Sequence, residues 1–192
     1  SSLQHPPAFS EQRLIAPMRT GLHNIVLAVR HPLDALLSNW AWWRHYSRTR
    51  TEHLLGINGV FGSTERFCAD VEANIDAFTA FVTNGDLSKL GIEDMTFLSL
   101  EGFLDETLAW MNIEGVQIMR FEDFTEPSGR QFEALNRCFF PNGDLRLTPV
   151  LPRAKPYPYR EIVATSSRIK NVLEELLSSS IREKIARSGY AI

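Results

Sequence analysis

One short segment contains an arginine and a serine that together have the chemistry of an anion receptor. Arg30 follows a run of branched apolar residues, and Asp34 and Ser38 come after it at four-residue intervals. An arginine presents a planar fork of N–H donors that matches a phosphate, and a serine hydroxyl adds a small polar group from a second direction. The four-residue spacing places Asp34 and Ser38 on one side of a helix. We therefore expect Arg30 and Ser38 to hold one phosphate group between them.

The elements on either side of Arg30 suit this role. Residues 25–29, with the sequence IVLAV, predict a parallel strand covered on both faces. Open parallel sheets bind ligands beyond the carboxyl ends of their strands, where Arg30 stands. Pro32 fits a first helical position, and the charge of Asp34 complements the helix dipole in the first turn. The alternative interpretation is an arginine that only caps the helix or pairs with a neighbour.

The pattern R-x-P-x-D-x-x-x-S, formed here by Arg30, Pro32, Asp34 and Ser38, resembles the 3'-phosphate-binding segment of sulfotransferases that use 3'-phosphoadenosine 5'-phosphosulfate (PAPS). A second segment, RFEDF at residues 120–124, resembles the family's Y-E-D-L hallmark after a strand. The resemblance implies an α/β, P-loop NTPase-like sulfotransferase fold in which the ring of Phe121 lies against the adenine of PAPS. Phenylalanine in place of tyrosine removes one hydroxyl from that contact.

A third segment, LQHPP at residues 3–7, resembles the K-T-H-L-P strand end that carries the family's catalytic histidine. The resemblance implies that His5 is the general base, and the near-neutral pKa of an imidazole suits that role. Leu3 stands where many members of the family have lysine. The alternative is that His5 is an ordinary histidine in a proline-rich terminus.

The family also binds the 5'-phosphosulfate in an amino-terminal loop resembling P-K-S-G-T-T, and no such segment occurs in these 192 residues. We therefore expect the chain to match roughly the last two thirds of the family's domain, without the first strand, loop and helix. The function implied is transfer of a sulfonate group from PAPS to a hydroxyl or amine acceptor, a carbohydrate or small metabolite, with no metal. The alternative is a degenerate relative that binds a nucleotide or a partner without turnover. A P-loop kinase relative is disfavoured because no Walker loop is present.

Composition sets the outer limits of these hypotheses. A chain of 192 residues predicts a single domain over residues 1–192. Lysine and arginine number 20 against 23 acidic residues, and this net charge of −3 does not favour nucleic acid or an anionic membrane as partner. Cys68 and Cys138 have no metal-ligand spacing and are expected to be reduced thiols. With no long apolar run and no signal-peptide pattern, we expect a cytoplasmic protein.

Hydrophobic periodicity gives the remaining elements. Strands separated by helices predict a parallel central sheet flanked by helices. The expected elements are a helix from about Pro32, one long helix from Glu65 to Val82, a helix through Phe103 and Met111, a second buried strand from Val116 to Met119, an irregular segment over residues 141–162, and helix from about Ser166 with a break at residues 178–180.

Two further groups of side chains have open roles. His31 is expected to help cap the helix after Arg30, and His45 to face solvent. The aromatic residues near a glycine-rich loop either build an acceptor-binding surface or pack in the core; they are Trp42, Trp43, Tyr46 and Phe61.

Overall fold

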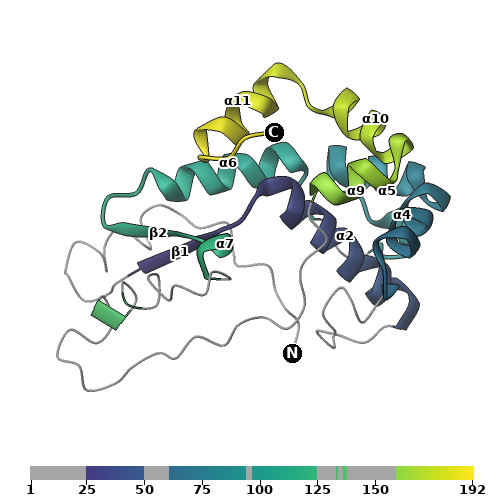
Figure 1. The fold of residues 1–192 in the computed structure, drawn as a ribbon, viewed down its shortest axis with the longest axis horizontal. Helices are drawn as coiled ribbons and strands as arrows, with labels where there is room; N and C mark the ends of the chain where they lie inside the picture. Colours follow the sequence, from purple (N-terminus) through teal and green to yellow (C-terminus); the bar gives the residue numbers. More distant parts are fainter. Residues whose placement is uncertain (1–24, 50–60, 94–96, 125–132, 134–135, 138–158) are drawn as a thin grey trace. The chain divides into compact units, whose positions relative to one another are not determined.

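The computed structural model describes residues 25–49, 61–93, 97–124, 133, 136–137 and 159–192 (Figure 1). The described chain is α/β, with mostly helices and a two-stranded parallel sheet. Its contacts divide into two compact units. The first holds β1 (Ile25–Val29), β2 (Val116–Arg120) and the short helix α7 (Phe121–Phe124), whereas the second holds most of the helices. The single domain expected from chain length stays a prediction.

The sheet contains both strands that the sequence predicts. β1 and β2 pair in parallel, in a register that runs from Ile25 opposite Val116 to Val29 opposite Arg120. The prediction that the strands are covered on both faces is wrong for the described side chains, because Ala28 and Ile118 are exposed. In the described part of the sheet each strand is an edge strand, so each has one side without a strand neighbour.

The helix α2 (Pro32–Thr49) begins at the predicted proline and runs for 18 residues. Its first turn closes with a hydrogen bond of 2.9 Å from the amide of Ala35 to the carbonyl of His31. The apolar residues that recur at three- and four-residue intervals along α2 are all buried: Leu33, Leu36, Leu37, Trp40 and Trp43. The helical spacing of these residues therefore predicts correctly which side of α2 faces the core.

The single long helix expected from Glu65 to Val82 is wrong. Two helices occupy the region, α4 (Thr64–Ala73) and α5 (Ile75–Asn84), and Asn74 separates them with φ −124° and ψ 32°. The side-chain amide of Asn74 donates to the carbonyl of Asp70 at 2.7 Å. Asparagine breaks the helix here because its side chain offers the backbone an alternative to the helical hydrogen bond.

A close backbone contact follows α5. Gly85 ends the helix at φ +68°, and its amide donates to the carbonyl of Phe81 at 2.9 Å. A Cβ atom on Gly85 would lie 1.7 Å from the carbonyl oxygen of Phe97. The chain then forms a short 3-10 helix, η1 (Ser88–Leu90), and the predicted helix α6 (Leu100–Met111). Glycine is required at position 85 by both its backbone conformation and this contact.

The last part of the chain contains three helices: α9 (Tyr159–Thr165), α10 (Ser167–Leu176) and α11 (Ser179–Arg187). The predicted break between the last two is confirmed, and the side chains of Ser166 and Ser178 cap α10 and α11. The irregular segment predicted up to residue 162 is wrong for its final residues, because α9 begins at Tyr159. The rest of that segment lies outside the described residues.

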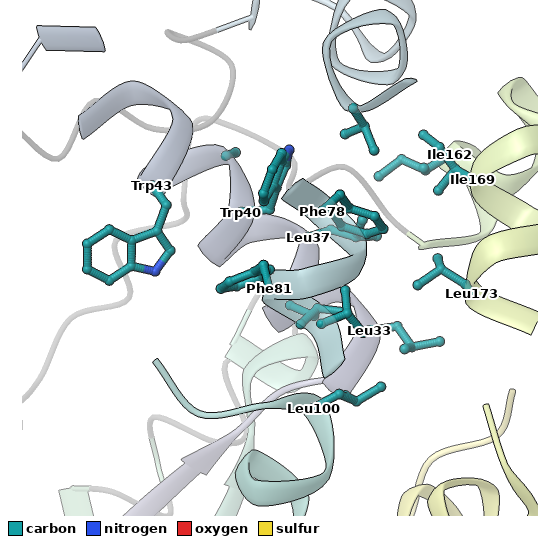
Figure 2. Packing of buried hydrophobic residues seen from close by; sticks show 14 of the residues in the cluster. Leu33, Leu37, Trp40, Trp43, Phe78, Phe81, Leu100, Ile162, Ile169 and Leu173 are labelled. Atoms are coloured by element: carbon teal, nitrogen blue, oxygen red, sulfur yellow. The ribbon is translucent and has the colours of Figure 1, made fainter. Parts of the chain in front are cut away.

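The core of the second unit is aromatic at its centre (Figure 2). The ring of Trp40 lies 5.3 Å from the ring of Phe78 and 5.7 Å from that of Phe81, measured between centroids. Apolar side chains from α9 and α10 complete the cluster; they include Ile162, Ile169 and Leu173. Of the helices that the structure describes, none has the length and apolar character to cross a membrane.

Candidate functional site

Arg30 and Ser38 lie together at the start of α2. The guanidinium Nη1 of Arg30 donates to the hydroxyl oxygen of Ser38 at 2.9 Å, although the two residues are two helical turns apart. Ser38 in turn donates its hydroxyl hydrogen to the carbonyl oxygen of Asp34 at 2.8 Å. The structure therefore brings together the two side chains that the sequence singles out for one phosphate. That they hold a phosphate stays a prediction.

The single hydrogen of Ser38 fixes the direction of these contacts. Because the hydroxyl gives its proton to the carbonyl of Asp34, it meets Arg30 as an acceptor. The arginine side chain is half-buried and lies over the first two turns of α2. Amide groups and the positive end of the dipole at a helix start favour an anion. The guanidinium is thereby held near a helix start that itself favours an anion.

Asp34 has a partner that its position in the first turn does not predict. Its carboxylate oxygen Oδ1 accepts a hydrogen bond from the backbone amide of Tyr159, 125 residues further along the chain. Tyr159 is the first residue of α9, so the carboxylate also lies at the amino-terminal end of that helix. Asp34 therefore joins α9 to the segment that carries Arg30 and Ser38.

His31 is also held by distant residues. Its Nε2 lies 3.0 Å from the carbonyl oxygen of Ala191, which can only accept, so Nε2–H is the donor. The imidazole stacks on Tyr159, with centroids 6.1 Å apart, and meets the ring of Tyr190 edge-on at 5.3 Å. Burial, with a smaller contribution from Glu174, raises the pKa of Tyr159, so its hydroxyl stays neutral. The prediction that His31 caps α2 holds for its backbone carbonyl, whereas its side chain reaches Ala191.

A second arginine cluster lies further along α2. Arg44 binds the carboxylate of Asp70 through two hydrogen bonds, of 2.8 Å and 2.9 Å, and the same carboxylate accepts one from Arg48. The guanidinium of Arg48 also lies 5.9 Å from the centre of the ring of Phe61. The cluster ties α2 to α4. It neutralises one arginine with an acid supplied by the protein itself.

The aromatic residues proposed for the acceptor surface divide into two groups. Trp43 and Phe61 are buried in the core, which supports the packing interpretation for both. Trp42 and Tyr46 are half-buried and stack on each other, with centroids 5.7 Å apart. The prediction that His45 faces solvent is wrong, since its Nε2 atom is buried.

The remaining predicted residues lie in different parts of the chain. Phe121 is half-buried and begins α7 in the first compact unit, and His5 and Cys138 lie outside the described residues. Cys68 is a free, buried thiol whose pKa burial raises to about 11, with smaller contributions from nearby acids. Within the described ranges, no group of histidine, cysteine and carboxylate side chains is arranged to hold a metal ion.

Comparisons with known proteins add nothing to this geometry. No model of a protein family, no curated protein and no solved structure matches the chain.

The contacts that sequence reasoning missed are those of His31 and Asp34 with Tyr159, Tyr190 and Ala191. The sequence gives little sign of these contacts, because the aromatic residues involved lie far along the chain and have no regular spacing to Arg30.

Proposed function

We propose that this protein is a PAPS-dependent sulfotransferase, or the larger part of one, and that Arg30 and Ser38 bind the 3'-phosphate of the nucleotide. The observation that carries the proposal is the 2.9 Å contact between these two side chains at the start of α2. It supports the resemblance of the R-x-P-x-D-x-x-x-S segment to the family, because the two polar groups expected around one phosphate lie together. A sulfotransferase fold of the P-loop type, in the cytoplasm, belongs to the same proposal.

The parallel strands are consistent with this role. β1 ends one residue before Arg30 in the chain, and β2 ends one residue before Phe121. Paired parallel strands present their carboxyl ends at one edge, where such folds bind nucleotides. The resemblance of the RFEDF segment to the family hallmark, and not the placement of the two units, is the basis for proposing Phe121 as the contact for the adenine.

The reaction requires few protein groups. The acceptor oxygen attacks the sulfur of the sulfonate, the bond from sulfur to the 5'-phosphate oxygen breaks, and 3'-phosphoadenosine 5'-phosphate leaves with the electron pair of that bond. His5 takes the proton that the acceptor hydroxyl loses. Arg30 and Ser38 do not touch the reacting atoms; they orient the nucleotide and select it over nucleotides without a 3'-phosphate. The acceptor in this scheme is a carbohydrate or a small metabolite.

Calorimetric binding of 3'-phosphoadenosine 5'-phosphate and of 5'-AMP to the full product of the gene tests the site. We expect the first nucleotide to bind more tightly, and Arg30→Ala to reduce that preference by roughly ten- to a hundredfold. Arg48→Ala is the matched control, because Arg48 is a half-exposed arginine at the other end of the same helix. Equal binding of the two nucleotides by the wild-type protein would contradict the proposal.

Turnover separates the enzyme from its alternative, a non-catalytic nucleotide-binding relative. Transfer of labelled sulfonate from PAPS to a panel of sugars and small alcohols is measured for the wild-type protein and for His5→Ala. The enzyme hypothesis predicts transfer that the variant loses while it still binds the nucleotide. Selective binding without transfer to any acceptor would favour the non-catalytic relative, which the substitution of lysine by Leu3 makes plausible.

A further inference from the structure

Three segments that are far apart in the sequence meet at the start of α2. The first carries Arg30, His31 and Asp34, the second begins α9 at Tyr159, and the third comprises Tyr190 and Ala191 after α11. All three belong to the same compact unit. His31 and Asp34, which follow Arg30 in the chain, therefore have partners from distant parts of the chain.

We infer that Tyr190 and Ala191 form a clasp on His31 that fixes the backbone beside Arg30 and so raises the affinity of the site for a 3'-phosphate. The inference rests on the proposed function. His31 and Tyr190 are positioning residues in this account, since they act through Arg30 and not on the nucleotide. The clasp consists of the hydrogen bond from His31 Nε2 to the carbonyl of Ala191, at 3.0 Å, and the edge-on contact of the two rings.

The need for a clasp follows from the position of Arg30 between two elements. A long arginine side chain loses about 2 kcal/mol of rotamer entropy when it is ordered, and a mobile backbone at its root adds to that cost. Groups that are ordered before the ligand binds no longer subtract that cost from affinity. Ser38 orders the far end of the side chain, whereas the clasp orders the residue next to its root.

A second line of contacts reaches the same guanidinium, and it meets the clasp only where the ring of Tyr159 stacks on His31. The amide of Tyr159 donates to Asp34, whose carbonyl accepts from Ser38, and Ser38 accepts from Arg30. These contacts are half-buried, whereas the His31 hydrogen bond of the clasp is exposed. Removal of the clasp is therefore expected to leave α2 folded and to change only the position of Arg30.

The first readout is the preference for 3'-phosphoadenosine 5'-phosphate over 5'-AMP. Tyr190→Ala removes the ring and is expected to lower that preference roughly three- to tenfold, the range of one lost hydrogen bond or ring contact. Tyr190→Phe keeps the ring and its edge-on contact with His31, so the preference is expected to fall less than in Tyr190→Ala. His31→Phe and His31→Gln form a second pair, in which only glutamine keeps a side-chain donor for Ala191.

Loss of stability alone is controlled by a distant variant. Val172→Ala removes a half-buried side chain from α10 that packs against the core. It is expected to lower the melting temperature without a change in nucleotide preference. If Val172→Ala and Tyr190→Ala reduce the preference equally, the clasp is not specific and the inference is wrong.

The second readout needs no nucleotide. Hydrogen exchange of the Ala35 amide, which donates to the carbonyl of His31, reports the first turn of α2, and the Phe67 amide reports the same position of α4. Tyr190→Ala is expected to speed exchange at Ala35 and not at Phe67. Unchanged exchange at Ala35 overturns the clasp.

If exchange changes while the wild-type protein shows no nucleotide preference, the proposed function fails and the positioning role fails with it. A preference that survives Tyr190→Ala overturns the clasp and leaves the proposed function intact.

Discussion

Two arginines near α2 are held in different ways. Arg44 meets the carboxylate of Asp70 through two hydrogen bonds, and the exposed fractions of the two side chains are 12% and 9%. Arg30 meets the hydroxyl of Ser38, which orients the guanidinium without adding a negative charge of its own. An arginine that is paired with an internal carboxylate serves the fold, because its charge is compensated by the protein. An arginine oriented by a neutral group is suited to meet an external anion.

The largest effect that tests this comparison is expected from Asp70→Asn. The change leaves two arginines around a shielded position without their carboxylate, so the free energy of unfolding should fall by about 3 kcal/mol. Arg30→Ala should cost less, because the hydrogen bond that it removes is to the neutral hydroxyl of Ser38 and contributes about 1 kcal/mol. Urea titration measures both. If Arg30→Ala costs more than Asp70→Asn, the roles of the two arginines are reversed.

The second prediction tests whether α4, which carries Asp70, is packed tightly against the core. The pKa of the buried Cys68 thiol is raised from 9.0 to about 11. The thiol stays protonated in the folded protein between these values, whereas the unfolded chain releases its proton. Stability from this group is therefore fully present below pH 9 and is lost as the pH rises to 11, by about 2 kcal/mol.

The measurement for Cys68 is urea titration at pH 8, 9, 10 and 11 for the wild type and for Cys68→Ala. The difference between the two proteins removes the contributions of other groups that titrate in this range, Tyr159 and Lys184 among them. A pH dependence that is the same in both proteins would mean that the thiol is hydrated and that α4 is loosely packed.

A smaller effect is expected from Arg44→Lys. Lysine keeps the charge but cannot donate two parallel hydrogen bonds to Asp70, so stability should fall by about 1 kcal/mol. Nucleotide binding should not change, since Arg44 belongs to the structural cluster. Thermal unfolding and calorimetry on the same sample check both statements. A loss of nucleotide preference in Arg44→Lys would show that the two clusters are coupled.

The smallest effect is expected from Ser38→Ala. The variant removes the hydroxyl that orients Arg30 while the guanidinium remains, so the preference for a 3'-phosphate should fall only about three- to fivefold. Stability should change by less than about 0.5 kcal/mol, because the serine in a helix interior donates to a carbonyl that the helix already uses. An effect as large as that of Arg30→Ala would mean that the hydroxyl contributes as much to phosphate binding as the guanidinium does.

The sequence predicts those parts of the fold that depend on local spacing. The strand at residues 25–29, the proline that begins α2 and its buried apolar side all follow from periodicity and helix-start chemistry. The break at Asn74 is missed because the apolar positions on either side keep helical spacing. The break is visible only in the structure, in the non-helical backbone of Asn74 and in its side-chain contact with Asp70.

The contacts of the site that are local in the sequence can also be predicted, whereas the distant ones cannot. Arg30 and Ser38 are eight residues apart, and the helix alone brings them together. The contacts of Asp34 with Tyr159 and of His31 with Ala191 span 125 and 160 residues. Such contacts are decided by how the helices of the unit pack, and no local pattern encodes them. The start of α9 is missed for the same reason, because its first amide is capped by Asp34.

The crowded contact at Gly85 has a consequence for mutational tolerance. Every other amino acid carries a Cβ, which at this position would overlap the carbonyl oxygen of Phe97, 1.7 Å away. Even alanine would have to push back the segment that leads into α6, and the left-handed backbone of Gly85 adds a second penalty. In a library that samples all substitutions, position 85 should therefore accept glycine almost alone, whereas its exposed neighbour Asn84 should accept many residues.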